Sequence, residues 1–249
     1  MSKYGICYQT ATIVRGSASH RGECVTQMLC NDIYEVISRL GSWLNIKLLE
    51  DGYEGWIPDC QHRDLDDKSF AALRNAPHWV CTEPLIRHKG QWLGLGCTTY
   101  EPIEGAIASP QYYNAELMTR YGLSLLGSPY MWGGKTALGI DCSGLVQICA
   151  KAAGMILPRD ASQQVQLGDI VYFLPECQRG DLAFFSNEDG KIIHVGILLG
   201  NDKILHASGG VRIDYIDQSG IYNAERNQHT HQLSVIKRIS EDNKNPLQG

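Results

Sequence analysis

The sequence predicts an α+β fold preceded by a small β-barrel. From about residue 110 onward, two helical patterns come before a series of strands, and this order is typical of an α+β domain. The first sixty residues instead contain short strands separated by tight turns, as in a small barrel. The chain has 249 residues, which is enough for both parts, since a domain commonly contains about 100–200 residues.

The predicted barrel occupies residues 1–60. Residues 33–37 and 43–48 alternate between apolar and polar side chains and contain many β-branched and aromatic residues, as strands do. Turns are expected at 39–42 and 50–52, and a third strand is expected at 53–57.

Residues 61–110 are expected to connect the barrel to the α+β domain. Residues 61–76 are charged at first and then rich in Ala and Leu. Strand-like runs follow at 78–82 and 92–95, within a segment (77–109) that is too short to hold a complete domain.

The α+β domain is expected to occupy residues 111–245. The spacing of apolar residues predicts a helix over 115–126, which Gly127 ends. A second helix is predicted over 142–153, followed by Gly154. Strands are then predicted at 170–173, 182–185, 192–199 and 204–207.

Charge and hydropathy exclude several classes of function. The formal net charge is −5, so no basic surface for nucleic acid is expected. No run of ~18 apolar residues is present to span a membrane. The chain begins without the charged, apolar and small-residue pattern of a secretory signal, so a cytoplasmic location is expected.

The nine cysteines are an odd number, and their spacing contains no Cys-x-x-Cys pair. A structural zinc site uses closely paired thiolates, and a disulfide framework uses an even set of cysteines. We therefore expect most of the cysteines to be buried free thiols in a reducing compartment. Neither a metal nor an organic cofactor is expected.

Cys142 differs from the other cysteines because it follows a glycine-rich loop and begins a predicted helix. The partial positive charge and unpaired N–H groups of a helix N-terminus favour a thiolate, so we expect its pKa to be lowered. The same N–H groups can hold an oxyanion during acyl transfer. The alternative is that Cys142 is one more small core residue, as Cys149 is expected to be in the middle of the same helix.

Two histidines, His194 and His206, interrupt apolar strand runs on either side of a hairpin turn at 200–202. A turn centred near residue 201 pairs His206 with Gly196, two residues from His194. Both imidazoles then point to one face as diagonal neighbours, within reach of a hydrogen bond. A cysteine nucleophile needs such a base and a group to orient it. The remaining histidines lie in polar or turn contexts with no sign of a metal site: His20, His62, His78, His88, His229 and His231.

Several motifs between about residues 115 and 240 resemble the NlpC/P60 cysteine peptidases. They are GSPYMWGG at 127–134, GIDCSGLV at 139–146, RGDLAFF at 179–185, HVGI at 194–197 and HAS at 206–208. The resemblance implies a papain-like α+β core and the cleavage of bacterial cell-wall peptides, usually after D-glutamate.

The same resemblance implies a role for four residues. Cys142 would be the nucleophile, His194 the general base and then general acid, and His206 the residue that orients His194. Tyr130 matches a tyrosine beside the nucleophile, where it would contact the substrate or the developing oxyanion.

Segments 14–27, 41–43 and 51–57 resemble a bacterial SH3-like (SH3b) module. Together with the peptidase motifs, they make the chain similar to γ-D-glutamyl-L-diamino acid endopeptidases of the dipeptidyl-peptidase VI type. In that family the SH3b module closes one end of the groove, so that only peptides with a free N-terminal L-Ala fit. The sequence departs from the family in having only the short segment 77–109 in place of a second full SH3b module, and Ala161 where a hydroxyl residue is expected.

The ammonium group of that alanine needs anionic or polar partners. Asp160 matches the family aspartate that binds it, and Asp141, Ser143, Glu23 and Tyr53 are further substrate-binding candidates by resemblance. Each of these four also has a structural alternative. Asp141 could instead be a helix N-cap, and Ser143 a hydroxyl of the first helical turn. Glu23 could be a surface charge, and Tyr53 an aromatic residue of the barrel core.

These residues predict a cysteine endopeptidase that acts on small murein peptides. It would hydrolyse the γ-D-Glu–L-diamino acid bond of peptides with a free N-terminal L-Ala and release L-Ala-D-Glu, in the recycling of cell-wall peptides. Two alternatives stay open: a peptidoglycan-binding protein without catalysis, and a Cys–His acyltransferase that passes the thioester to another nucleophile. The sequence predicts no oligomeric state.

Overall fold

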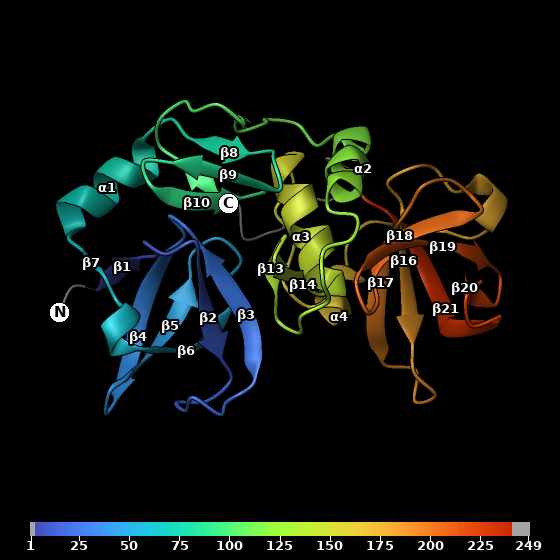
Figure 1. Ribbon diagram of the computed structural model, residues 1–249, viewed down its shortest axis with the longest axis horizontal. Helices are drawn as coiled ribbons and strands as arrows, with labels where there is room; N and C mark the ends of the chain where they lie inside the picture. Colours follow the sequence, from blue (N-terminus) through green and yellow to red (C-terminus); the bar gives the residue numbers. More distant parts are fainter. Residues whose placement is uncertain (1–2, 241–249) are drawn as a thin grey trace.

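The N-terminal strands form a seven-stranded antiparallel sheet in the computed structural model, which describes residues 3–240 (Figure 1). The strand order is β3-β2-β6-β5-β4-β1-β7, and the sheet surrounds a core that includes the fully buried Val14, Leu44 and Ile57. This core forms because alternate residues of the strands are apolar. The bounds are β1 Tyr4–Ile6, β2 Ala11–Arg15, β3 Cys24–Leu29, β4 Ile33–Leu40, β5 Trp43–Leu48, β6 Glu54–Pro58 and β7 Asp64–Leu65.

The three strands predicted for this part are present. The run at 43–48 is confirmed as β5, and the third strand is confirmed one residue later than expected, as β6. β4 continues to Leu40, so the turn before β5 is shorter than 39–42 and contains Gly41 with φ of +59°. A left-handed backbone of this kind favours glycine, which explains how so short a turn joins the two strands.

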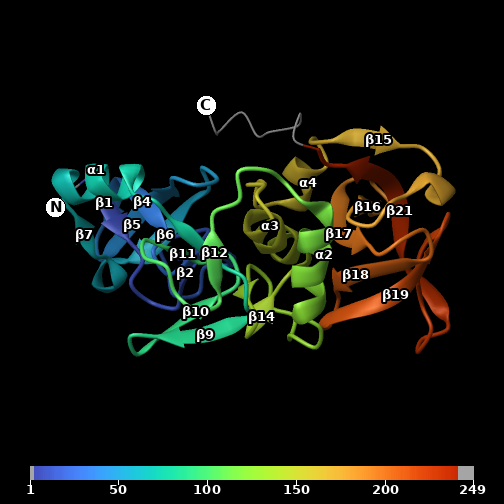
Figure 2. The same cartoon turned by 90° about the horizontal axis from the view of Figure 1, so that it is seen from above.

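Residues 61–110 contain a helix and two small sheets. Helix α1 (Asp67–Asn75) begins after Asp66, whose carboxylate accepts a hydrogen bond from the Ser69 N–H at 2.8 Å. The sheets have the orders β10-β9 and β11-β8-β12 and share a hydrophobic core with helix α3. This segment therefore lies beside α3 and over one end of the N-terminal sheet (Figures 1 and 2). Its strands are β8 Trp79–Cys81, β9 Leu85–His88, β10 Gln91–Gly94, β11 Thr98–Thr99 and β12 Ala106–Ala108, and a 3₁₀ turn at Asp59–Gln61 precedes it.

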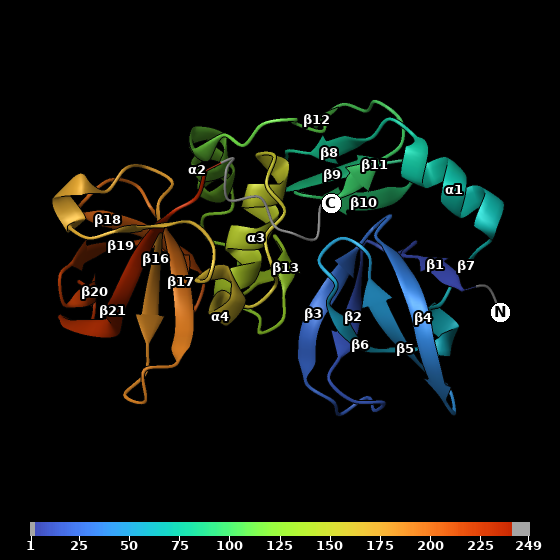
Figure 3. The ribbon, with the colours of Figure 1, turned by 180° about the vertical axis from the view of Figure 1, so that it is seen from behind.

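Both predicted helices are present and end slightly earlier than expected. They are α2 (Ala115–Ser124) and α3 (Cys142–Ala152), and they pack together at the centre of the molecule (Figure 3). Gly127 and Gly154 follow them with φ of +83° and +99°, as expected for glycines that end helices. No helix within residues 3–240 is long and apolar enough to cross a membrane. The remaining short elements here are β13 Lys135–Thr136, β14 Gly139–Ile140 and α4 Ala161–Gln164.

The C-terminal strands form a second antiparallel sheet, in the order β15-β21-β16-β17-β18-β19-β20. β21 pairs with both β16 and β20, so the sheet closes into a small barrel. Helix α3 packs against β17 and β18, which form the side of the barrel nearest the centre (Figure 1). The bounds are β15 Asp169–Val171, β16 Leu182–Ser186, β17 Ile192–Leu198, β18 Lys203–Ala207, β19 Val211–Asp217, β20 Gly220–Asn223 and β21 Gln228–Arg238, with a 3₁₀ turn at Leu174–Glu176.

The strands predicted up to residue 207 are confirmed with shifts of a few residues at their ends, whereas β19, β20 and β21 were not predicted. β21 contains mostly polar residues, so its alternation is weak, whereas β19 (VRIDYID) does alternate but exposes apolar residues on its outer face. They matter for function because β19 and β21 contribute side chains to the site described next.

Candidate active site

Cys142 is the first residue of α3, and its thiol is buried with 6% exposure. The carboxylate of Asp141 caps the helix by accepting a hydrogen bond from the Gly144 N–H at 2.7 Å. Burial raises the pKa of Cys142 to about 11, and the negative charge of Asp141 adds to this effect. Hydrogen bonds from the N–H groups of Val195 and Ser143 act in the opposite direction but are weaker. The lowered pKa expected from the helix N-terminus is therefore wrong for the resting thiol, because desolvation and the capping carboxylate outweigh the N–H groups that favour a thiolate.

The two predicted histidines are joined by a hydrogen bond. β17 and β18 pair with Gly196 opposite His206, which is the register that the sequence predicts. His194 Nε2 lies 2.8 Å from His206 Nδ1, and both side chains are buried. Helix α3, which begins at Cys142, packs against the same strand, and the N–H of Val195, the residue after His194, acts to lower the pKa of the Cys142 thiol.

Asp214, which was not among the residues predicted from the sequence, extends this pair into a series of three side chains. His206 Nε2 lies 3.1 Å from Asp214 Oδ2, and Arg212 Nη2 donates a hydrogen bond to Asp214 Oδ1 at 3.0 Å. Burial raises the pKa of Asp214, but the hydrogen bonds from His206 and Arg212 outweigh burial and leave the pKa below its usual value. Asp214 is therefore a carboxylate at neutral pH.

The hydrogen-bonding roles of Asp214 determine where the protons of the two histidines lie. A carboxylate only accepts, so the proton of neutral His206 lies on Nε2 and its Nδ1 is an acceptor. His194 must then donate from Nε2 to His206 Nδ1. The other nitrogen of His194, Nδ1, keeps its lone pair and is the one able to accept a proton.

His231, which lies in a polar stretch of the sequence, packs against the ring of His194. Its ring stacks on that of His194 with centroids 4.2 Å apart and an interplanar angle of 25°. Burial lowers the pKa of His194 well below its usual value, and the neighbouring His231 and His206 lower it further. Burial likewise lowers the pKa of His231 to about 4. Across residues 3–240, no three His, Cys, Asp or Glu side chains are arranged to hold a metal ion.

A cavity of about 500 Å³ lies where the N-terminal sheet meets α4. The Tyr53 hydroxyl donates to the carboxylate of Asp160, at 3.3 Å from each oxygen, across 107 residues of sequence. Burial raises the pKa of Asp160, and Arg159 and Tyr53 oppose this only in part. The other acidic residues that line the cavity are Asp51 and Glu54.

Arg159 connects the helix start to the N-terminal sheet and is 2% exposed. Its guanidinium donates to Asp141 Oδ2 at 2.6 Å, to the Ser143 hydroxyl at 2.8 Å and to the Thr26 hydroxyl at 3.0 Å. The structural alternatives for Asp141 and Ser143, a helix N-cap and a first-turn hydroxyl, are therefore confirmed. Direct contact of these two side chains with a substrate stays a prediction.

The remaining two candidates lie on the loop before α3 and on the N-terminal sheet. Glu23 is exposed and accepts a hydrogen bond from Trp132 Nε1 at 2.6 Å, so it links the sheet to the loop at 127–134. Tyr130 is 36% exposed. Its partial burial raises the pKa of its hydroxyl to about 12, and the nearby Cys142 adds to this effect. Its hydroxyl therefore remains a hydrogen-bond donor at neutral pH.

Comparison with known proteins identifies the family to which the chain belongs. A model of the NlpC/P60 family matches residues 127–232, and a model of the bacterial dipeptidyl-peptidase Sh3 domain matches residues 14–61. A gamma-D-glutamyl-L-lysine dipeptidyl-peptidase of Bacillus subtilis (strain 168) is 44% identical over 212 residues, covering 73% of this chain and 71% of that protein. The chain belongs to the NlpC/P60 family of cysteine peptidases.

More distant relatives agree with this class. A gamma-D-glutamyl-L-lysine dipeptidyl-peptidase of Bacillus cereus (strain ATCC 10987 / NRS 248) is 26% identical over 227 residues, covering 73% of this chain and 66% of that protein. The crystal structure of an NlpC/P60 family protein from Bacillus cereus ATCC 10987 superposes with a TM-score of 0.79 at 18% identity, over 95% of this chain and 99% of that one. This likeness confirms the α+β fold, and the family-model match to residues 14–61 confirms its SH3-like N-terminal part.

Proposed function

We propose that this cysteine peptidase hydrolyses the γ-D-Glu–L-diamino acid bond of murein peptides with a free N-terminal L-Ala and releases L-Ala-D-Glu. The observation that carries the proposal is the hydrogen-bonded series His194–His206–Asp214 beside the thiol of Cys142. The names of the two relatives, gamma-D-glutamyl-L-lysine dipeptidyl-peptidases, support the same bond and class of substrate.

The reaction begins with a neutral thiol and a neutral imidazole, because the pKa of Cys142 is raised and that of His194 is lowered. His194 Nδ1 takes the thiol proton as the sulfur attacks the γ-carbonyl of D-Glu. The proton then passes to the amine of the diamino acid as the C–N bond breaks, leaving a thioester on Cys142. Water attacks the thioester after giving a proton to His194, and the sulfur leaves and regains that proton.

Tyr130 and the start of α3 are suited to hold the oxyanion of both tetrahedral intermediates. The N–H groups of Val195 and Ser143 act on the Cys142 sulfur, which favours a position near the carbonyl that the sulfur attacks. The raised pKa of Tyr130 keeps its hydroxyl protonated and able to donate. Donors placed before the reaction in a buried site stabilise the developing charge more than water does.

The cavity at Tyr53 and Asp160 is proposed to hold the N-terminal ammonium of L-Ala. Asp160 supplies the negative charge, and Tyr53 orients that carboxylate through its hydroxyl. Glu23 is proposed to act from the same sheet, beside the loop that carries Tyr130. A charged amine leaves water only for such partners, so an acetylated N-terminus would be a poor substrate.

We also propose that the protein works in the cytoplasm on peptides already released from the wall. All nine cysteines are free thiols, and five of them besides Cys142 are fully buried side chains of the cores. Unpaired cysteines in this number are typical of a reducing compartment. The division into an SH3b-like part (1–60), a connector with a short SH3b-like segment (61–110) and a catalytic domain (111–245) is retained as a proposal.

Cys142→Ala tests the proposed chemistry with the free tripeptide L-Ala-γ-D-Glu-L-Lys. We expect release of L-Ala-D-Glu, followed by mass spectrometry, to fall below detection, because the thiol is the nucleophile of the proposed mechanism. Cys149→Ala, on the same helix but in the core, is the matched control and should retain turnover. Unchanged turnover by Cys142→Ala would discard the mechanism, and transfer of the dipeptide to an added amine would identify an acyltransferase instead.

A further inference from the structure

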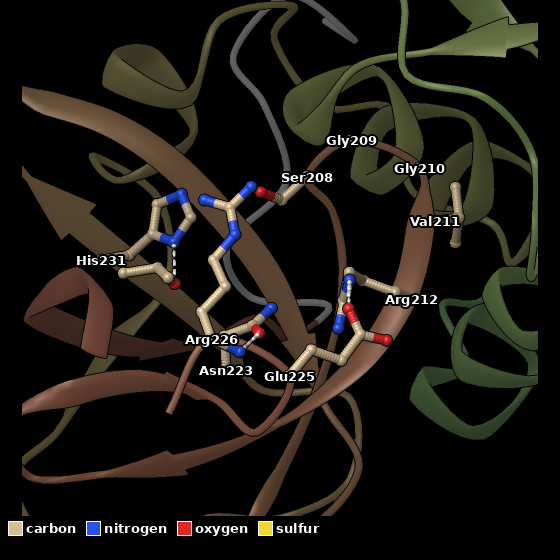
Figure 4. A pocket seen from close by; sticks show the side chains of 10 residues that line it. Ser208, Gly209, Gly210, Val211, Arg212, Asn223, Glu225, Arg226 and His231 are labelled. Carbon is tan, nitrogen blue, oxygen red and sulfur yellow. Dashed lines mark hydrogen bonds and ion pairs between the residues drawn. The ribbon is translucent and has the colours of Figure 1, made fainter. Parts of the chain in front are cut away.

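A second cavity, of about 650 Å³, lies beside the histidines on the C-terminal barrel (Figure 4). It is lined by the turn after β18 and the first residues of β19 (208–212), by Asn223, Glu225 and Arg226 at and after the end of β20, and by Thr230 and His231 of β21. None of these residues takes part in the amine cavity, which is formed by the N-terminal sheet and α4. The N-terminal sheet and the C-terminal barrel, which carry the two cavities, lie on opposite sides of α3 (Figure 1).

Three contacts place this cavity next to the reacting groups. His231, in its wall, stacks on His194. Arg212, also in its wall, holds Asp214. Gly210 forms a backbone bridge with Pro129, the residue before Tyr130. A peptide whose amine end lies at Asp160 and whose scissile bond lies at Cys142 would thus extend its leaving portion into this cavity.

The charges of the two cavities differ in sign. The described residues that line the amine cavity include Asp51, Glu54 and Asp160 and no lysine or arginine. The second cavity contains two arginines and a single acid, Glu225, which pairs with Arg212 at 3.2 Å. A short peptide with an ammonium at one end and a carboxylate at the other matches this polarity in one direction only.

Arg226 is the cation available to a ligand. Arg212 is engaged by Asp214 and Glu225, whereas the guanidinium of Arg226 has no hydrogen bond or ion pair with any part of the chain that the structure describes. Figure 4 shows the Arg226 side chain extending into the cavity toward Ser208 and His231. The Ser208 hydroxyl likewise has no side-chain partner among residues 3–240, so it can donate to the same ligand.

We propose that Arg226 and Ser208 bind the terminal carboxylate of the leaving peptide, and that the enzyme therefore prefers free short peptides over chains blocked at that end. This inference rests on the proposed function, because it assigns the site for the second product. A guanidinium with a neighbouring hydroxyl suits a carboxylate, since charge-assisted hydrogen bonds are the stronger kind. An amide at the same position would leave the guanidinium without its counter-charge.

The test compares L-Ala-γ-D-Glu-L-Lys with its C-terminal amide, using the wild type and Arg226→Gln. We expect the wild type to have a kcat/KM about 10- to 100-fold higher for the free acid, the range of one charge-assisted interaction. Arg226→Gln should bring the value for the acid close to the wild-type value for the amide, and Arg226→Lys should restore part of the preference. Arg74→Gln, on α1 away from the site, is the control and should keep the wild-type preference.

The outcomes separate this proposal from the function on which it rests. If the wild type cleaves neither peptide, the proposed function fails. If it cleaves the acid and the amide equally, or if Arg226→Gln lowers both values by the same factor, only the carboxylate site is overturned. Arg226 is exposed, so a thermal melt of the variant should match that of the wild type and exclude unfolding as the cause.

Discussion

The two sides of the active site are built in different ways. On the C-terminal barrel, His194, His206 and Asp214 come from three consecutive strands and lie within 12 and 8 residues of one another along the chain. On the other side, Tyr53 and Asp160 are 107 residues apart and meet only because the N-terminal sheet packs against α4. The pairing register of neighbouring strands determines where the side chains lie on the first side. Packing between separate parts of the chain determines where they lie on the second.

One geometric relation produces the whole series on the barrel. Gly196 is opposite His206 on β17, and His194 lies two residues away from Gly196. Arg212 is opposite His206 on β19, and Asp214 again lies two residues away. Residues two apart share a face of a strand, so each partner of His206 is a diagonal neighbour. A mutation on this side should therefore affect proton transfer, whereas one on the other side should affect which substrate is chosen.

Asp214→Asn should have the largest effect of the three substitutions proposed in this Discussion. The amide can donate to His206 Nε2, which would move the proton of His206 to Nδ1 and that of His194 to the nitrogen needed as the base. We expect kcat for the tripeptide to fall about 10- to 100-fold, as for loss of one charge-assisted hydrogen bond, with little change in KM. Steady-state kinetics with Asp217→Asn, an exposed residue of the same strand, provides the control. A loss confined to KM would contradict a role in orienting the histidines.

Sequence reasoning was sufficient for the part of the site that register determines. The turn at 200–202 and the spacing of His194 and His206 predicted their pairing, which the hydrogen bond confirms. The same reasoning applied to β19 would have found Asp214, but that strand was not recognised. The turn Ser208-Gly209-Gly210 and the alternation that follows it were the available signal.

Other features depend on long-range packing that no local pattern encodes. The stacking of His231 on His194 requires the barrel to close, because β21 reaches β16 and β20 only in the folded chain. The raised pKa of Cys142 results from burial beneath segments distant in sequence. Arg159 has contacts with both Asp141 and Thr26, so its role depends on how the N-terminal sheet docks. In each case the environment, and not the residue type, determines the property.

Asp160→Asn tests the side of the active site that depends on packing. Its effect should be smaller than that of Asp214→Asn and should change the preference between substrates instead of kcat. The variant keeps the size and polarity of the side chain but loses the charge that faces the ammonium of L-Ala. We expect the preference for the free over the N-acetylated tripeptide to fall about tenfold, since a partly exposed ion pair is weaker than a buried one. The measurement is the ratio of kcat/KM for the two peptides, with Gln163→Ala as a control in the same cavity. A tenfold fall in kcat for both peptides would instead show that Asp160 contributes to the chemical step and not to the choice of substrate.

His231→Ala should produce the smallest change, a shift in pH dependence. His194 must be neutral to accept the thiol proton. The value of kcat/KM is therefore at its maximum above the pKa of His194 and falls as the pH drops below that pKa. Because burial and the neighbouring histidines lower this pKa, the acid limb of the wild type should lie below the usual histidine value of about 6.5. Removing His231 admits water to the His194 ring and so reduces the desolvation that lowers its pKa, and the acid limb should move to higher pH, by up to about one unit. Profiles of kcat/KM from about pH 4 to 8 measure this shift. His229→Ala, on the same strand, is the control. An acid limb that stays in place or moves to lower pH would show that His231 does not lower the pKa of His194.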